Sequence, residues 1–223
     1  MGQLVFIVGK SGSGKSTSLR NLDPESTVII NTDQKALPFR NFKEKYNEEK
    51  GNYLKTSDVS TVLTKLKEVH KNKDVKTVII DTISRLGTDF IMSPGFRAER
   101  GFDKWNKLSG AIYDLINIIN DKLRDDIIIY LMGHPDTLVD DMGTQSHRLS
   151  MPGKQLDKFM LESFSSIVLY TEVVKNPGAN NEYYFSTICN NNTAKTPIDL
   201  FEESLIPNDL TQVNKAIREY YDI

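Results

Sequence analysis

Gly9-Lys10-Ser11-Gly12-Ser13-Gly14-Lys15-Ser16-Thr17 is the stretch of this sequence that decides the fold. It fits the phosphate-loop pattern G-x-x-x-x-G-K-S/T without a mismatch. The apolar run Leu4–Val8 before it is typical of a buried strand, and residues 16–22 after it can begin a helix that Pro24 stops. A strand, a glycine-rich turn and a helix in this order aim backbone N–H groups and the positive helix end at a phosphate. The stretch therefore predicts a nucleoside triphosphate site.

The positions in this loop have different expected tasks. All nine residues are candidate contacts to the nucleotide. Lys15 is expected to reach the β- and γ-phosphates, and the Ser16 hydroxyl to ligate Mg²⁺. A glycine-rich turn without a ligand is the alternative, and it leaves the strand, the spacing and the Lys-Ser pair unexplained. The expected cofactors are ATP and Mg²⁺.

Composition and length predict one sizeable domain over residues 1–223, in which residues 175–223 add a hairpin and a helix. The formal net charge of −2 excludes a strongly basic polyanion binder, so any nucleic-acid contact must come from local basic clusters. The one cysteine, Cys189, cannot form an intramolecular disulfide and is expected to be a small strand residue. The sequence enters a strand at once and has no apolar run of about 20 residues, so we expect no signal peptide, no membrane contact and a cytoplasmic location.

Strand-like and helix-like segments alternate along the chain. The expected strands after the first are 27–31, 76–81, 126–132, 167–171 and 183–189, the last two forming a hairpin; the expected helices are 59–70, 105–123, 154–164 and 209–221. Residues 41–51 are charged and predicted to be a loop or a solvated face. This alternation predicts an α/β fold with a mostly parallel central sheet flanked by helices and a C-terminal β-hairpin extension. In such sheets ligands bind at the carboxyl ends of the strands.

Two acids follow expected strands. Asp81 ends the run Val78–Ile80 and is predicted to hold Mg²⁺, with a helix cap as the alternative role. Thr82 follows it where many ATPases carry a glutamate that polarises water, so a hydrolase needs its base elsewhere. Asp33, just past the second strand, is the best-placed candidate, and a simple turn residue is the alternative.

His134 follows the strand that ends Tyr130-Leu131-Met132-Gly133. A polar side chain at this position can sense the γ-phosphate and pass its presence to the next segment. A structural histidine held by hydrogen bonds is the alternative. Lys15, Asp33, Asp81 and His134 are therefore the candidate catalytic residues.

Several segments together resemble the RecA-like recombination ATPases. Residues 30–37 resemble the strand, catalytic acid and Ala-Leu stretch of that family, and 153–170 resemble the helix and strand that follow its second DNA-binding loop. The tail segments 195–197, 206–210 and 220–221 are similar to those of small phage RecA-like ATPases of the Sak single-strand-annealing group. The resemblance implies a catalytic role for Asp33 in place of the family's glutamate and a sensing role for His134 in place of its glutamine.

The resemblance also implies where DNA would bind. Residues 84–104 are expected to form a DNA-binding loop that interleaves basic and aromatic side chains: Arg97, Arg100, Lys104, Phe96 and Phe102. A lid over the nucleotide or a partner surface is the alternative. A second loop, 135–153, contributes Arg148 but also acids, and Lys154 after it is a candidate for reaching the γ-phosphate of a neighbouring subunit.

The function expected from the residues and the resemblance is a DNA-stimulated ATPase acting on single-stranded DNA in phage-type recombination or annealing. The host cytoplasm is the expected location if a phage encodes the chain. Expected partners are single-stranded DNA, further copies of the chain, and single-strand-binding or other replication and recombination proteins. A small-molecule kinase and a nucleotide-gated adaptor of a replication or defence complex stay open as alternatives.

Overall fold

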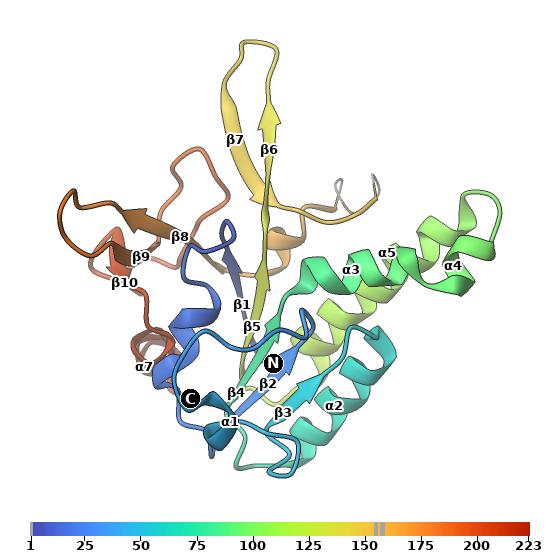
Figure 1. Cartoon of the computed structure of the whole chain (residues 1–223), viewed down its shortest axis with the longest axis horizontal. Helices are drawn as coiled ribbons and strands as arrows, with labels where there is room; N and C mark the ends of the chain where they lie inside the picture. Colours follow the sequence, from blue (N-terminus) through green and yellow to red (C-terminus); the bar gives the residue numbers. More distant parts are fainter. Residues whose placement is uncertain (1, 154–155, 157–158) are drawn as a thin grey trace.

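One mixed sheet forms the centre of the protein, and helices cover both of its faces (Figure 1). The structure, a computed structural model, describes residues 2–153, 156 and 159–223. Within this part the sheet has eight strands. They are β1 (Gln3–Val8), β2 (Thr27–Asn31), β3 (Tyr53–Lys55), β4 (Thr77–Asp81), β5 (Ile128–Gly133), β8 (Ile167–Val174), β9 (Glu182–Ser186) and β10 (Leu205–Pro207).

The strand order is β10-β9-β8-β1-β5-β4-β2-β3. The strands from β8 to β3 pair in parallel with their neighbours, whereas β9 and β10 are antiparallel. This confirms the predicted parallel sheet and the predicted β8–β9 hairpin. Because β5 lies between β1 and β4, the ends of these three strands and of β2 meet at one edge of the sheet.

The helical segments are η1 (Ser16–Asn21), α1 (Phe42–Lys45), α2 (Val59–Lys71), α3 (Ile83–Met92), α4 (Pro94–Ala98), α5 (Asp103–Asn117), η2 (Ile118–Lys122), η3 (Leu161–Phe164) and α7 (Leu210–Tyr221). Their beginnings follow from the sequence. Asp58 caps α2 by accepting a hydrogen bond from Thr61 N at 2.8 Å, and Asp209 caps α7 in the same way through Thr211 N at 2.9 Å.

Alternation along the strands produces a core on each face of the sheet. In β1, Leu4, Phe6 and Val8 join the cluster that packs under α2, α3 and α5, while Val5 and Ile7 join the cluster under η1 and α7. Strands that are apolar on both faces require helices on both faces, so the run of apolar residues itself dictates three layers. The sheet edge that carries the phosphate loop is thereby fixed from two sides.

Some of the expected elements differ in detail. The helix expected over 105–123 is α5, which begins at Asp103 and continues into the π-helical turn η2. In the region expected to be irregular, 41–51, the short helix α1 forms, and β3 follows it. Part of the expected helix 154–164 lies outside the described residues, and its described end is the 3₁₀ turn η3. Cys189 is exposed and lies beyond the end of β9, so its prediction as a strand residue was wrong; its Sγ lies 2.9 Å from the Asn192 carbonyl oxygen.

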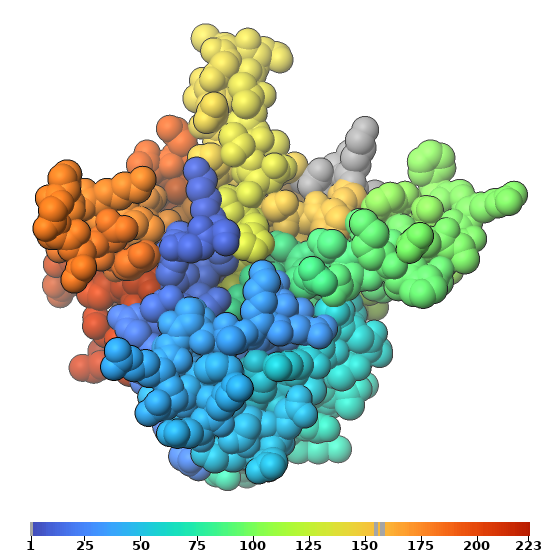
Figure 2. All heavy atoms as spheres, viewed as in Figure 1, coloured from blue at the N-terminus to red at the C-terminus, as the bar shows by residue number. Residues whose placement is uncertain are grey.

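Neither of the two expected DNA loops is a loop. Residues 84–104 form most of α3, all of α4 and the start of α5, because apolar side chains at helical spacing pack against the sheet. Residues 135–153 contain β6 (Pro135–Val139) and β7 (Gln145–Leu149), an antiparallel hairpin that stands out from the body of the molecule (Figures 1 and 2). None of the helices in the described part is both long and apolar enough to cross a bilayer.

Candidate nucleotide site

The phosphate loop leaves β1 and turns over the edge of the sheet. Its start is fixed by Gly9 N, which donates to the Gly133 carbonyl at 3.1 Å. A side chain at Gly9 is impossible, since a Cβ there would lie 1.7 Å from Thr171 Oγ1. Gly14 has φ of +98°, in the region that favours glycine. These glycines allow the close approach and the reversed turn of a phosphate cradle.

Lys15 lies inside the cradle. Its Nζ donates to the carbonyl oxygens of Gly9, at 2.6 Å, and Lys10, at 3.0 Å. Burial lowers the pKa of Lys15, and the nearby carboxylates of Asp81 and Asp33 offset part of that effect. A triphosphate at this position would favour the charged ammonium more strongly than two backbone carbonyls do. Lys15 is therefore placed as the main cation of an anion site.

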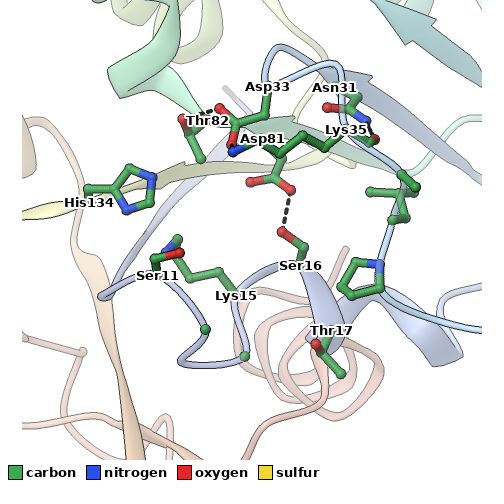
Figure 3. Close-up of a pocket in the computed structure, with 15 residues that line it drawn as sticks. Ser11, Lys15, Ser16, Thr17, Asn31, Asp33, Lys35, Asp81, Thr82 and His134 are labelled. Carbon is green, nitrogen blue, oxygen red and sulfur yellow. Dashed lines mark hydrogen bonds and ion pairs between the residues drawn. The ribbon is translucent and has the colours of Figure 1, made fainter.

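Ser16 and Asp81 face each other across the site (Figure 3). Ser16 Oγ donates to Asp81 Oδ2 at 2.6 Å, which brings two oxygen ligands to one point. Asp81 is buried at the end of β4, and burial raises its pKa while the hydrogen bond from Ser16 opposes that shift. Mg²⁺ is usually held in phosphate sites by one or two protein oxygens together with phosphates and water, and this pair fits such a site. Within the described part, three or more His, Cys, Asp or Glu side chains do not gather at any point that suits a metal ion.

Asp33 lines the same cavity, whose volume is about 290 Å³, and lies beside Asp81: its backbone N–H donates to the Asp81 carbonyl at 3.2 Å. Its Oδ1 lies 3.3 Å from Thr82 Oγ1, which donates to it, and its Oδ2 lies 3.3 Å from the ammonium of Lys35 (Figure 3). The carboxylate is partly exposed to the cavity, as a group that contacts water must be. The structure thus brings Asp33 to the site, as the sequence predicted.

His134 borders the cavity at the junction of β5 and β6 (Figure 3). Burial and, next in size, the charge of Lys15 lower its pKa, so the imidazole is neutral at neutral pH. Its backbone N–H donates to Ser84 Oγ at 3.2 Å, and its carbonyl accepts from Ser150 N at 2.7 Å. His134 therefore connects the cavity to α3 and to the base of the β6–β7 hairpin.

Two polar residues that the sequence analysis did not identify shape this site. The buried Asn31 donates from Nδ2 to the Lys35 carbonyl at 2.6 Å and to Tyr53 Oη at 2.7 Å, which fixes the turn that carries Asp33. Thr32 Oγ1 donates to the Thr82 carbonyl at 2.7 Å and so joins the ends of β2 and β4. In the sequence, Asn31 and Thr32 are distinguished only as polar residues at the end of a strand. That pattern does not indicate which residues they bond to.

Some of the residues expected to contact DNA are exposed in the structure, and one of them is buried. Arg97, Arg100 and the 88% exposed Phe102 lie on the surface at α4 and the turn after it; with Lys104 we call them the basic arm. Phe96, also expected to stack on a base, is only 8% exposed, and its ring lies 5.1 Å from that of Trp105. Phe96 is a packing residue, so its assignment to DNA was wrong.

The two remaining candidates lie elsewhere. Arg148 is half-buried on β7, opposite Asp136 of β6, at the base of the hairpin rather than on a flexible loop. Lys154, the expected contact to a neighbouring subunit, lies outside the described residues. The structure does not bring Arg148 into the cavity of Lys15 and Asp81.

The phosphate loop lies within the part of the chain that matches a known family. A family model described as an AAA domain (AAA_24) matches residues 1–198. None of the curated proteins matches the chain. Among solved structures, the flagellar accessory protein FlaH from Methanocaldococcus jannaschii is similar at 14% sequence identity, over 82% of this chain and 76% of that one, with a TM-score of 0.40.

Proposed function

The chain belongs to the AAA-domain family whose model it matches and carries the phosphate loop of an ATPase, and we propose that it is a DNA-stimulated ATPase acting on single-stranded DNA. One observation carries the ATPase part of the proposal. Lys15, the Ser16–Asp81 pair, Asp33 and His134 come from four different strand ends and converge on a single cavity. These are the parts that phosphoryl transfer to water requires: a phosphate cradle, a metal site, a group that orients water and a sensor.

The chain's own residues have separate tasks in this proposal. The loop backbone and Lys15 bind the triphosphate, and Ser16 with Asp81 would hold Mg²⁺, which neutralises charge on the phosphates. Asp33 accepts a hydrogen bond from the attacking water and orients it. Neutral His134 senses the γ-phosphate, and the connections of its backbone to Ser84 and Ser150 link that contact to α3 and to the hairpin.

The DNA part of the proposal is supported by the basic arm. Arg97 and Arg100 are exposed, and Phe102 presents nearly its whole ring to solvent. Cations that follow phosphates beside a ring that stacks on bases suit a single strand. The resemblance to phage annealing ATPases supports a role in recombination or annealing, with further copies of the chain and single-strand-binding proteins as proposed partners.

The experiment measures ATP turnover with and without single-stranded DNA, and DNA affinity at several salt concentrations. We expect DNA to stimulate the parent protein. The double variant Arg97→Ala/Arg100→Ala should lose affinity, and its log–log salt slope should fall by about 1.4, at about 0.7 for each lost phosphate contact. Phe102→Ala should weaken binding by about 1–3 kcal/mol with little change in slope.

A matched control variant removes two positive charges from a part of the surface outside the basic arm. Lys71, the last residue of α2, and Lys73, just after it, are exposed, so Lys71→Ala/Lys73→Ala also removes two positive charges. If both double variants lose equal affinity, the arm is not the DNA site. Turnover that a small-molecule acceptor stimulates, and DNA does not, would indicate a kinase, and turnover that neither stimulates would indicate an adaptor.

A further inference from the structure

The C-terminal segment returns to the phosphate loop. Asn208 and Asp209 connect β10, which ends at Pro207, to α7, and both are hydrogen-bonded to η1, the short helix that follows the loop. Arg20 of η1 donates from Nη1 to the Asn208 carbonyl at 2.7 Å, and Asn21 donates to Asp209 Oδ2 at 2.7 Å. This part of the chain lies beyond the residues that the family model matches. Its contacts with η1 are additional to the elements of the cavity described above.

The side chain of Asn208 is unusual within this segment. It is 3% exposed, and among the described residues neither its Oδ1 nor its Nδ2 has a hydrogen-bond partner. Both atoms lie against the phosphate loop, since a Cβ added at Gly14 would be 3.1 Å from Oδ1 and 3.2 Å from Nδ2. The backbone around the amide is fixed, because Asn208 N donates to the Tyr183 carbonyl at 3.1 Å. The amide is thus held against the phosphate loop, and Asn208 is not among the described residues that line the cavity.

Such an amide is costly to bury. Buried polar side chains in folded proteins are nearly always hydrogen-bonded. A conformation that leaves such a side chain unpaired has a higher free energy than one that pairs it. The main chain at Gly14 lies beside the amide; its carbonyl accepts from Ser18 N at 3.0 Å and has a second lone pair that the amide can use. A small rotation of the loop would give the amide a partner there, and the form of the protein with that bond would be favoured over the form without it.

We propose that Asn208 is a positioning residue for the phosphate loop, whose amide bonds to the main chain at Gly14 when the loop holds a triphosphate. In a trans peptide the C=O and the N–H point in opposite directions, so an amide that binds a loop carbonyl from behind turns the N–H of that peptide toward the phosphate. The C-terminal segment thereby stabilises the nucleotide-bound form of the loop. The inference rests on the proposed nucleotide site and assigns to residues 207–209 a task within it.

The six-residue η1 explains why such support is useful. It is a 3₁₀ helix, and its N-cap, Lys15, makes no side-chain capping bond. A short 3₁₀ segment aligns fewer peptide dipoles than an α-helix and holds its end less rigidly. The bonds from Arg20 to Asn208, and from Arg20 to the Thr17 carbonyl at 3.1 Å, fix this segment instead.

The test compares Asn208→Leu with Asn214→Leu. Asn214, also in the C-terminal segment, is fully paired: it donates to Thr77 Oγ1 at 3.0 Å and accepts from Tyr130 Oη at 2.7 Å. The measurements are unfolding by urea without nucleotide and the affinity for a fluorescent ATP analogue with Mg²⁺. Asn208→Leu should keep or raise the urea midpoint, because it removes an unpaired amide, and should bind the analogue about tenfold more weakly. Asn214→Leu should lower the urea midpoint and keep the parent's affinity.

The two variants should have opposite effects: Asn208→Leu weakens nucleotide binding without lowering the urea midpoint, and Asn214→Leu lowers the midpoint without weakening binding. This difference distinguishes a positioning role from a structural one. Parental affinity in Asn208→Leu would overturn the inference and leave the proposed nucleotide site intact. If the parent protein itself does not bind the analogue, the proposed nucleotide site fails, and the inference fails with it. Should leucine prevent folding, Asn208→Ala carries the same comparison, since it removes the amide without adding volume, and parental affinity in that variant would overturn the inference equally.

Discussion

Asp33 and Asp81 are both carboxylates at strand ends, yet their surroundings give them different properties. Asp81 is buried, receives a hydrogen bond from Ser16 and has a raised pKa. Asp33 is partly exposed and lies beside Lys35. A buried carboxylate next to a hydroxyl suits a metal, and an exposed one suits water. Substitution of Asp33 and substitution of Asp81 should therefore affect different steps of nucleotide binding and turnover.

We predict that Asp33→Asn keeps the affinity for ATP and slows turnover by about 10²–10⁴-fold, since it removes the acceptor that orients water. Asp81→Asn should instead abolish the dependence of binding on Mg²⁺. A raised carboxylate pKa means that folding disfavours the charged form at neutral pH, so Asp81→Asn should also increase the free energy of unfolding. Turnover, nucleotide affinity with and without Mg²⁺, and urea unfolding measure these effects.

Asp121→Asn is the matched control for both acids, because Asp121 is exposed and lies on η2 away from the cavity. It should change none of the three quantities. Normal turnover in Asp33→Asn would show that another group orients the water.

His134 gives a prediction about pH. Its pKa in the folded protein lies below the ordinary value of 6.5, because burial and Lys15 disfavour the imidazolium. Between these two pKa values the unfolded chain binds a proton that the folded protein does not, so stability falls as pH decreases through this window. His134→Gln has no such proton and should lose less stability than the parent between pH 7 and pH 5. Urea unfolding at several pH values measures this difference, and parallel profiles would contradict it.

At the scale of residues, the sequence predicted what local pattern determines. The phosphate loop, Asp81, Asp33 and His134 each follow an apolar run, and a strand end places them without knowledge of the rest of the chain. Asn208 could not be found in this way. The hydrogen bond between Arg20 and the Asn208 carbonyl spans 188 positions, and no local pattern reports such a contact.

At the scale of elements, two errors have physical reasons. The β6–β7 hairpin is exposed on both sides for most of its length, so its strands lack the alternation of apolar and polar residues that marks a half-buried strand. The one indication of a hairpin in this segment was Gly143, a glycine that adopts the positive φ of +82° that the turn requires. For α3 a helical signal was present, since Ile83 and Leu86 are both buried on one face, but the resemblance favoured a loop there.

The C-terminal helix was predicted over residues 209–221, and the structure confirms it as α7, Leu210–Tyr221. It buries Leu210, Val213 and Ile217 against the sheet face that also holds Val5 and Ile7. We predict that Ile217→Ala lowers the free energy of unfolding by about 2–5 kcal/mol, because it leaves a cavity in this layer. Urea or thermal unfolding measures the change.

The control for Ile217 lies on the same helix and faces solvent. Glu219 forms an exposed ion pair with Lys215 at 3.7 Å, so Glu219→Ala should change stability by less than about 1 kcal/mol. Equal losses in the two variants would mean that α7 is not anchored by its apolar face.

At the scale of the whole molecule, the sequence predicted the parallel sheet but not the order of its strands. Alternation of strands and helices indicates parallel pairing, whereas the place of β5 between β1 and β4 results from packing across the full chain. That order matters for the site, because it sets His134 between the phosphate loop and Asp81. The formal charge of −2 matters too, since any attraction of polyanions must come from local clusters of basic residues and not from the net charge.

The β6–β7 hairpin has a mechanical consequence. β5 is held by two neighbours inside the sheet, and the main chain passes from it through His134 directly into β6. Each arm of the hairpin has five residues, about 17 Å at about 3.4 Å per residue, so a tilt of about 10° at its root would move its tip by about 3 Å. A small rotation of the main chain at His134 would therefore displace the tip of the hairpin by several times the movement at its base.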